Sequence, residues 1–361
     1  MKIGWITDDF AKIPGGEMPG GCAFYRCYLP LFASRLPGTM GRPAWTGERG
    51  FGVKDGHMKA QFGFDTVVTK LLMARWVPAQ MQIAQSLGQR VIVDVDDLYD
   101  EIHDSNQAKG WSDPEVNKVQ NRAIYDQSIM LADTVTVTTP YLLNHYVAKG
   151  HPDVRMIRNG VLPTQFDPRH VRNTRPVIGW VGMINYRSND LEELRSWLPD
   201  FLEEHDLRFH HSGVLHDATE SIADLIGFDP ARLTTSPAAP FHRYKDLFTF
   251  DIGIVPLSDI PFNHAKSALK GLEYASAGIP FVAQGLPEYQ RIAEEGVGRV
   301  AVTPGDWRRE MTALLDYKTR KREAACNLSE VYRRHTIEAV APEWQGLLLE
   351  AVPSFSIGLR S

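Results

Sequence analysis

The feature that most constrains the fold of this chain is a repeated alternation between short apolar runs and segments of helical periodicity. Such alternation is typical of parallel sheets that are covered by helices on both faces. The expected strands of the first half are residues 2–7, 64–69, 90–95, 132–139 and 154–161. Those of the second half are residues 177–182, 207–213, 251–257, 279–283 and 298–303. The pattern therefore predicts an α/β chain with two doubly wound units.

A segment without periodicity separates the two units. Residues 162–176, LPTQFDPRHVRNTRP, are rich in proline and arginine, which is typical of a linker. The length of 361 residues also favours two domains over a single core. We expect an N-terminal domain over residues 1–170 and a C-terminal domain over residues 171–335. Ligands of such sheets bind beyond the carboxyl ends of the strands, so the cleft between the domains is the expected site.

Composition and charge exclude several classes of protein. The net charge of −5 argues against a surface built throughout for nucleic acid or an anionic membrane, although it leaves a local basic patch open. Three cysteines do not fit a disulfide framework. The amino terminus leads directly into a strand, and no apolar run reaches the length of a transmembrane segment. We therefore expect a cytoplasmic protein.

The segment FNHAKSALKGLEYASAGIPFVA carries the most informative group of charged residues. It predicts one continuous helix that begins at Asn263 and ends at Gly278. Lys266, Lys270 and Glu273 are spaced to share one face of that helix. The face is either solvated, with an ion pair between Lys270 and Glu273, or it binds a ligand.

The position of this helix favours the ligand. It begins just after the expected strand 251–257, so its N-terminus faces the cleft, where free N–H groups suit a phosphate. The two lysines would add charge for a diphosphate, and the carboxylate of Glu273 could accept both hydroxyls of a ribose. The sequence therefore predicts a site for a nucleoside diphosphate.

The same segment carries a resemblance to a known family. LEYASAGIPFVA (272–283) resembles the C-terminal domain signature of GT-B fold glycosyltransferases, especially the retaining family-4 type. Residues 132–168 are similar to the stretch that leads out of the N-terminal domain in those enzymes. VIGWVG (177–182), followed by Arg187, is similar to their first C-domain strand and its basic residue. The resemblance covers most of residues 1–345.

The resemblance implies the GT-B architecture and assigns roles. Two Rossmann-like domains would face a central cleft, with the acceptor on the N-terminal domain and the nucleotide sugar on the C-terminal domain. A C-terminal helix within residues 336–361 would cross back to the N-terminal domain. Glu273 would bind the nucleotide ribose, and Arg187 with Lys266 and Lys270 the diphosphate. Ala265 stands where the family has a first glutamate, so the resemblance does not say how the sugar hydroxyls are bound.

A glycine-rich loop, PGGEMPGGCAFYR (14–26), lies between the first strand and the first helix. Its spacing fits neither a dinucleotide fingerprint nor a P-loop. By the resemblance, backbone at Gly21 would approach the donor phosphates. Arg26 is a candidate partner for an anion, or else for a surface acid.

An acidic segment, VDVDDLYDE (93–101), follows an expected strand of the N-terminal domain. A metal-binding DxD is typical of a single-domain glycosyltransferase fold, and the two-domain pattern argues against it. Asp96 or Asp97 is the predicted catalytic residue, as general base or as stabiliser of positive charge on the sugar. His103 is a weaker candidate. The alternative is that Asp97 caps a helix and that Asp94 and Asp96 are solvated.

Several other positions are candidates of lower weight. His210 and His211 point to opposite faces of a strand and cannot ligate one metal, so we expect no metal site. His211 and Ser267 are candidate cleft-lining residues. Residues 35–60 are irregular, glycine-rich and basic, and Trp45 with Phe51 could contact an anionic or aromatic acceptor, DNA included, unless the segment is only a solvated excursion.

The sequence as a whole predicts a glycosyltransferase whose donor is a UDP- or GDP-sugar. No cofactor is required, because cationic side chains would stabilise the departing diphosphate. The acceptor is open among a saccharide or lipid intermediate, a protein side chain and a hydroxylated DNA base, and the acidic charge disfavours DNA. The alternatives are a nucleotide-sugar epimerase of the same fold and a non-catalytic nucleotide-sugar binding protein.

Overall fold

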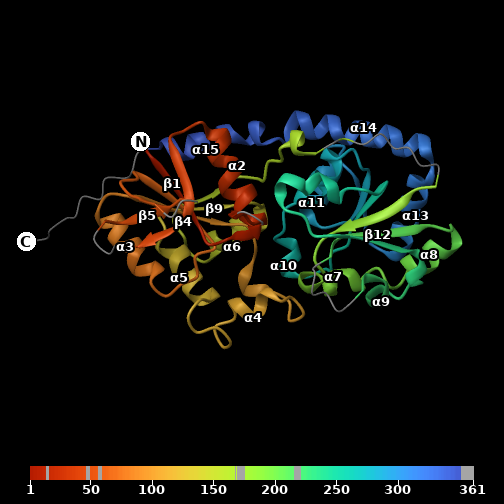
Figure 1. The fold of residues 1–361 in the computed structure, drawn as a ribbon, viewed down its shortest axis with the longest axis horizontal. Coiled ribbons are helices and arrows are strands. Elements are labelled where there is room, and N and C mark those ends of the chain that lie inside the picture. The colour runs from red at the N-terminus through yellow and green to blue at the C-terminus, as the bar shows by residue number, and fades with distance from the viewer. Residues whose placement is uncertain are drawn as a thin grey trace, which may run out of the picture.

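The computed structural model describes residues 1–13, 16–45, 49–55, 59–166, 168, 175–214 and 221–350. Two sheets, each flanked by helices, form two domains side by side along the long axis of the molecule (Figure 1). The expected fold class, two doubly wound α/β units in one chain, is confirmed.

The sheet of the N-terminal domain has the strand order β10-β9-β8-β7-β1-β4-β5-β6. Its strands are β1 (Ile3–Thr7), β4 (Gly38–Trp45), β5 (Phe51–Lys54), β6 (Ala60–Gln61), β7 (Thr66–Lys70), β8 (Arg90–Val95), β9 (Thr134–Val137) and β10 (Val154–Met156). The strands from β10 to β4 are parallel, and β5 and β6 are antiparallel to their neighbours. The helical segments are α1 (Gly21–Ala23), a π-helical turn (Phe24–Tyr28), α2 (Leu29–Ser34), α3 (Val77–Ser86), α4 (Ala108–Ser112), α5 (Arg122–Leu131) and α6 (Pro140–Ala148).

Two regions expected to be irregular contain strands. β4, β5 and β6 extend the sheet through residues 35–60, of which residues 46–48 and 56–58 lie outside the described part. A hairpin also precedes the first helix: its strand β2 (Phe10–Ile13) comes just before the glycine-rich loop, and its strand β3 (Gly16–Pro19) lies within that loop. The first correction concerns one end of the sheet, and the second concerns a separate two-stranded sheet. The strands from β10 to β1 follow the predicted apolar runs.

The sheet of the C-terminal domain has the order β13-β12-β11-β14-β15-β16, and its strands are all parallel. They are β11 (Val177–Val181), β12 (Arg208–Val214), β13 (Leu233–Pro237), β14 (Ile252–Val255), β15 (Phe281–Gln284) and β16 (Arg299–Ala301). The helices are α7 (Ser188–Glu192), α8 (Leu198–Glu204), α9 (Ile222–Ile226), α10 (Pro261–His264), α11 (Leu269–Ser276), α12 (Pro287–Glu294) and α13 (Pro304–Leu315).

The last two helices connect the domains a second time. α14 (Tyr317–Arg334) runs along the C-terminal domain, and α15 (Ile337–Leu349) lies on the N-terminal domain (Figure 1). Trp344 of α15 is fully buried against Trp5 of β1, with ring centroids 5.3 Å apart. Ile337 N donates to the Val161 carbonyl at 2.7 Å. The two places where the chain passes between the domains therefore lie next to each other. Apolar packing therefore fixes α15 to the first strand of the chain.

Candidate active site

A pocket lies between the two domains, at the carboxyl ends of strands from both sheets. Its volume is about 520 Å³, within the usual range of small-molecule sites. The chain reaches it after β1, β8, β11 and β14, as expected for parallel α/β sheets. Most of the predicted site residues line it: Gly21, Asp96, Asp97, Arg187, Lys266, Ser267, Lys270 and Glu273.

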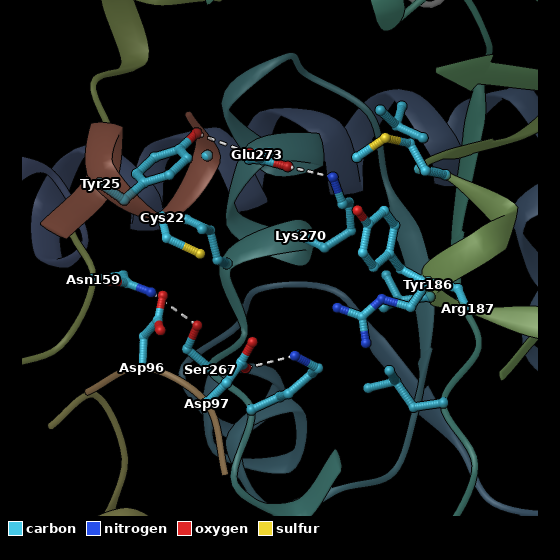
Figure 2. A pocket seen from close by; sticks show the side chains of 18 of the residues that line it. Cys22, Tyr25, Asp96, Asp97, Asn159, Tyr186, Arg187, Ser267, Lys270 and Glu273 are labelled. Carbon is cyan, nitrogen blue, oxygen red and sulfur yellow. Dashed lines mark hydrogen bonds and ion pairs between the residues drawn. The ribbon is translucent and has the colours of Figure 1, made fainter. Parts of the chain in front are cut away.

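Glu273 of α11 forms the most constrained part of the pocket wall. The residue is 2% exposed. Tyr25 Oη donates to its Oε1 at 2.8 Å, and Tyr244 Oη donates to its Oε2 at 3.1 Å. Lys270 Nζ forms an ion pair with Oε2 at 2.8 Å (Figure 2). Burial and the Glu273 charge raise the pKa of both tyrosines well above the ordinary value, so both remain donors. Three separate segments thus orient this carboxylate.

α10 and α11 are separate helices, which corrects the prediction of one continuous helix. In the turn between them, the Ala265 carbonyl accepts a hydrogen bond from Thr139 Oγ1 at 2.9 Å. Ser267 Oγ accepts one from Asn159 Nδ2, also at 2.9 Å. The bond from Thr139 takes the place of the helical hydrogen bond that the Ala265 carbonyl would accept in a continuous helix, and the bond from Asn159 links the turn to the N-terminal domain a second time. Lys266 therefore lies in a connecting turn and not on the helix face predicted for it.

Three cationic side chains line the pocket from the C-terminal domain. Arg187 follows β11, and its Nη1 contacts Asp190 Oδ2 at 3.4 Å. Burial, and after it the nearby Arg187 charge, lowers the pKa of Lys266 below 10.5. For Lys270, burial acts to lower the pKa, but the Glu273 charge and other nearby groups act against burial and outweigh it. The pKa of Lys270 therefore lies above 10.5. This wall concentrates positive charge where an anionic ligand would enter.

Two carboxylates that follow β8 lie on the opposite wall. Asp96 forms an ion pair with the buried Lys70 of β7. Burial raises the pKa of Asp96, but Lys70 lowers it more, and the pKa lies below the ordinary value. Asp97 Oδ1 accepts from Lys266 Nζ at 2.6 Å (Figure 2). Asp97 therefore pairs with a residue of the other domain. The alternative interpretation, in which Asp97 caps a helix, does not agree with this contact.

The phosphate contacts predicted at the first helix are only partly available. Arg26 does not line the pocket, because its side chain is 1% exposed and its Nη2 pairs with Asp94 Oδ2 at 2.6 Å. The predicted role of Arg26 in binding a phosphate is corrected to a structural ion pair, and Asp94 is buried rather than solvated. At the start of the helix, Asp9 Oδ2 accepts from Ala23 N at 2.8 Å. Gly21 lines the pocket beside this cap.

The remaining candidates lie away from the pocket or outside the described part. His211 Nε2 donates to the Gly182 carbonyl at 2.9 Å, so its buried ring packs within the domain and does not line the cleft as predicted. His103 is exposed and does not line the pocket. Phe51 is fully buried in the core of the N-terminal domain, which corrects its predicted contact with an acceptor. The side chain of Trp45 falls outside what the structure describes.

Sequence reasoning missed Lys70, Tyr25 and Tyr244. Lys70 ends β7, and β8 is the parallel neighbour of β7. The carboxyl ends of parallel neighbours meet at one edge of the sheet, so the sequence could have predicted that this lysine lies beside the acids that follow β8. The tyrosines had no such signal. Tyr25 and Glu273 are 248 residues apart in the chain, and only the folded arrangement brings them together.

Within the described ranges, no group of three or more histidine, cysteine, aspartate or glutamate side chains is arranged to bind a metal ion. In the same part of the chain, none of the helices has the combination of length and apolar character that a membrane span requires.

Solved structures share this backbone arrangement. The sucrose-phosphate synthase of Thermosynechococcus elongatus is similar with a TM-score of 0.65 at 14% identity, over 96% of this chain and 98% of that chain. HepE of Anabaena, in complex with UDP-glucose, gives a TM-score of 0.62 at 13% identity, over 96% of this chain and 99% of that chain. A glycosyltransferase from Rickettsia africae gives 0.55 at 11% identity, over 80% and 78%. The chain has the GT-B fold.

The GT-B fold confirms the architecture that the sequence resemblance implied. A scan against protein-family models and a search of curated proteins find no match for the sequence. The likeness therefore extends to the fold, and what the chain does must be argued from its pocket.

Proposed function

We propose that the protein is a glycosyltransferase that transfers a sugar from a UDP- or GDP-sugar to an acceptor hydroxyl. The observation that carries this proposal is the charge arrangement in one pocket. A buried, oriented carboxylate lies beside three cations on the C-terminal domain, and two carboxylates lie on the wall opposite. The complexes of HepE with UDP and with UDP-glucose support a nucleotide-sugar donor for this fold.

The donor would bind the wall of the C-terminal domain. Glu273 would accept hydrogen bonds from the ribose hydroxyls, which requires Tyr25 to share or leave Oε1. Arg187, Lys266 and Lys270 would bind the diphosphate. Because these cations already face the pocket, they can stabilise the charge that develops on the departing diphosphate without reorganising, and no metal is needed for that step.

The acceptor hydroxyl would be activated from the opposite wall. Asp97 is the better candidate of the two predicted carboxylates, because its partner Lys266 is also a candidate phosphate ligand. A bound diphosphate would attract Lys266 and leave Asp97 free to take the acceptor's proton. The partner of Asp96 is the buried Lys70, which is not a candidate phosphate ligand, so a bound diphosphate would not free Asp96 in the same way. Retention of the anomeric configuration is proposed from the family resemblance alone.

The charge of Glu273 is expected to matter for nucleotide affinity. Charge-assisted hydrogen bonds are worth about 1.5–3 kcal/mol, so Glu273→Gln should weaken the binding of UDP or GDP by about 10- to 100-fold. Isothermal titration calorimetry with UDP, GDP, UDP-glucose and GDP-mannose measures this directly.

Glu288→Gln is the matched control for that experiment. Glu288 is also a buried, ion-paired glutamate of the C-terminal domain, but it does not line the pocket. We expect it to leave nucleotide affinity unchanged. If none of the four nucleotides binds the wild-type protein, or if Glu273→Gln binds them as tightly as wild type does, the proposal of a nucleotide site is wrong.

Product analysis separates transfer from the two alternatives. With donor alone, a transferase hydrolyses the donor slowly, because water replaces the missing acceptor. An epimerase of the same fold would convert the donor into its isomer, and a binding protein would leave it unchanged. Chromatography of the nucleotide products after incubation distinguishes the three.

The affinity for UDP is expected to fall at alkaline pH. Lys266 has a lowered pKa in the free protein, and a bound diphosphate would raise that pKa, because it adds negative charge. The affinity for UDP is therefore highest at pH values below the pKa that Lys266 has in the free protein. It falls as the pH rises from that pKa toward the higher pKa that Lys266 has in the complex. The expected loss is on the order of tenfold, since one charge-assisted contact is removed. Calorimetry between pH 7 and pH 10 measures it.

Lys266→Arg should abolish this pH dependence, because arginine stays charged throughout the range. Lys270→Arg should leave the pH dependence in place, because the pKa of Lys270 is raised, not lowered. A pH profile of Lys266→Arg that matches wild type would assign the titration to another group.

A further inference from the structure

The two walls of the pocket carry opposite charge. Among the described lining residues, those of the C-terminal domain include three cations and one carboxylate. Those of the N-terminal domain include Asp9, Asp96 and Asp97 but no lysine or arginine. A phosphate on the acceptor would meet three carboxylates, and the only cations beside them, Lys70 and Lys266, are already paired with Asp96 and Asp97 among the described residues. This wall therefore suits an acceptor without negative charge.

The same wall presents an aromatic surface at its edge. Trp111 of α4 lines the pocket and is 40% exposed, an unusual degree for the largest side chain. The ring of Tyr99, which also lines the pocket, contacts it with centroids 6.3 Å apart and planes at 54°. An indole that is both exposed and supported offers a flat apolar face to a ligand.

Asn106 adds a free polar group beside these rings. The residue is 6% exposed and lines the pocket. Its Oδ1 accepts from Ala108 N at 2.9 Å, whereas its Nδ2 donates to no group in the part of the chain that the structure describes. Because Asn106 lines the pocket, this amide donor is available to a hydroxyl of a bound ligand.

The segment that carries these residues is bound to the opposite domain. Gln107 N donates to the Asn185 carbonyl at 2.9 Å, next to Tyr186 and Arg187 on the donor wall. A ligand on Trp111 would therefore lie beside the proposed donor site, within the same pocket. No further closure is needed to bring the two together.

The surroundings of Trp111 are acidic. Residues 99–118 contain five acids, Asp100, Glu101, Asp104, Asp113 and Glu115, against Lys109 and Lys118. Lys109 is already paired with Asp104. A nucleic-acid acceptor would need basic residues along this edge for its phosphates, and the charge here has the opposite sign.

We propose that Trp111, Tyr99 and Asn106 form the acceptor subsite, and that its ligand is an uncharged saccharide. The apolar face of a sugar ring would stack on Trp111, and a hydroxyl would accept from Asn106 Nδ2. Another hydroxyl would point toward Asp97. Its oxygen bonds to the anomeric carbon of the donor on the face from which the diphosphate departs, as the bond from that carbon to the diphosphate oxygen breaks, so the anomeric configuration is retained. The bonding electrons leave with the diphosphate, and the acceptor's proton passes to Asp97. This assignment rests on the proposed glycosyltransferase function.

Variants of Trp111 test the subsite. With UDP-glucose as donor and glucose or maltose as acceptor, Trp111→Ala should raise the acceptor KM at least tenfold. The UDP Kd and the slow hydrolysis of donor in water should stay within about twofold of wild type. Trp111→Phe should restore most of the acceptor affinity, because it keeps an apolar face. Tyr332→Ala removes a comparably exposed aromatic residue of α14 outside the pocket and should change nothing.

A panel of acceptors tests the charge argument independently of turnover. Saturation-transfer NMR of maltose, glucose 6-phosphate and a duplex containing 5-hydroxymethylcytosine should detect binding of maltose alone, and Trp111→Ala should remove that signal. Stronger binding or faster transfer with the phosphate or the duplex overturns the proposal, as does absence of any saccharide binding. If the protein still binds nucleotides when the acceptor subsite is overturned, the proposed glycosyltransferase function is not affected. Saccharide binding without nucleotide binding removes that proposal instead.

Discussion

Asp97→Asn is expected to lower kcat by about 10²- to 10⁴-fold, the usual contribution of a positioned general base. Asparagine has a similar shape but cannot take the acceptor's proton or stabilise positive charge on the sugar. UDP affinity should stay equal or rise slightly, because Lys266 loses its partner in the free protein and becomes more available to the diphosphate. Single-turnover assays with saturating donor, together with calorimetry of UDP, measure the two quantities separately.

The geometry explains why this effect is assigned to Asp97 and not to Asp96. The partner of Asp96 is the fully buried Lys70, which has no route to the donor. The partner of Asp97 lies on the opposite wall, among the candidate phosphate ligands. A bound donor would therefore compete for the partner of Asp97 but not for the partner of Asp96.

Asp100→Asn is the matched control. Asp100 is an ion-paired aspartate of the same segment, bound to Lys149 at 2.9 Å, but it does not line the pocket. Its substitution should leave kcat within about twofold of wild type. If Asp97→Asn instead keeps its kcat and weakens UDP binding, Asp97 serves only to position Lys266, and the catalytic assignment fails.

The parallel core of both domains could be predicted from the sequence. A strand that is buried on both faces is expected to be a nearly continuous apolar run. β7 and β8 are buried at every position, and apolar residues dominate the centre of each strand. β4 and β5 were missed because their glycine and proline residues are read as turn signals. Gly41 is instead required by close packing, since a Cβ at this position would overlap the carbonyl oxygen of Lys54.

The candidate site was predictable only where it is local in sequence. Lys270 and Glu273 lie one helical turn apart, so their proximity follows from the helix itself. The break between α10 and α11 could not be predicted from the local sequence, because the hydrogen bond from Thr139 to the Ala265 carbonyl depends on the other domain. Arg26 was misassigned for the same reason. A cation in a glycine-rich loop is typical of phosphate binding, and the sequence around Arg26 does not reveal its buried partner Asp94 on a distant strand.

Arg26→Met is expected to lower the free energy of unfolding by about 3–5 kcal/mol, the usual effect of removing one partner of a buried ion pair. Arg26 Nε and Nη2 both bind Asp94, and Nη1 donates to the Ile157 carbonyl at 2.8 Å. The guanidinium also lies over the ring of Trp344, 5.1 Å from its centroid. One side chain therefore links the first helix, two segments of the sheet and the C-terminal helix. Urea denaturation followed by circular dichroism measures the loss.

Two further variants separate the ion pair from general damage. Arg26→Met combined with Asp94→Leu should be less destabilised than Arg26→Met alone, because no buried charge is left without its partner. Arg333→Met removes an exposed arginine paired with Glu330 and should cost less than about 1 kcal/mol. UDP affinity of folded Arg26→Met should equal that of wild type, since Arg26 does not line the pocket. A tenfold loss of UDP affinity without loss of stability would instead return Arg26 to the diphosphate site.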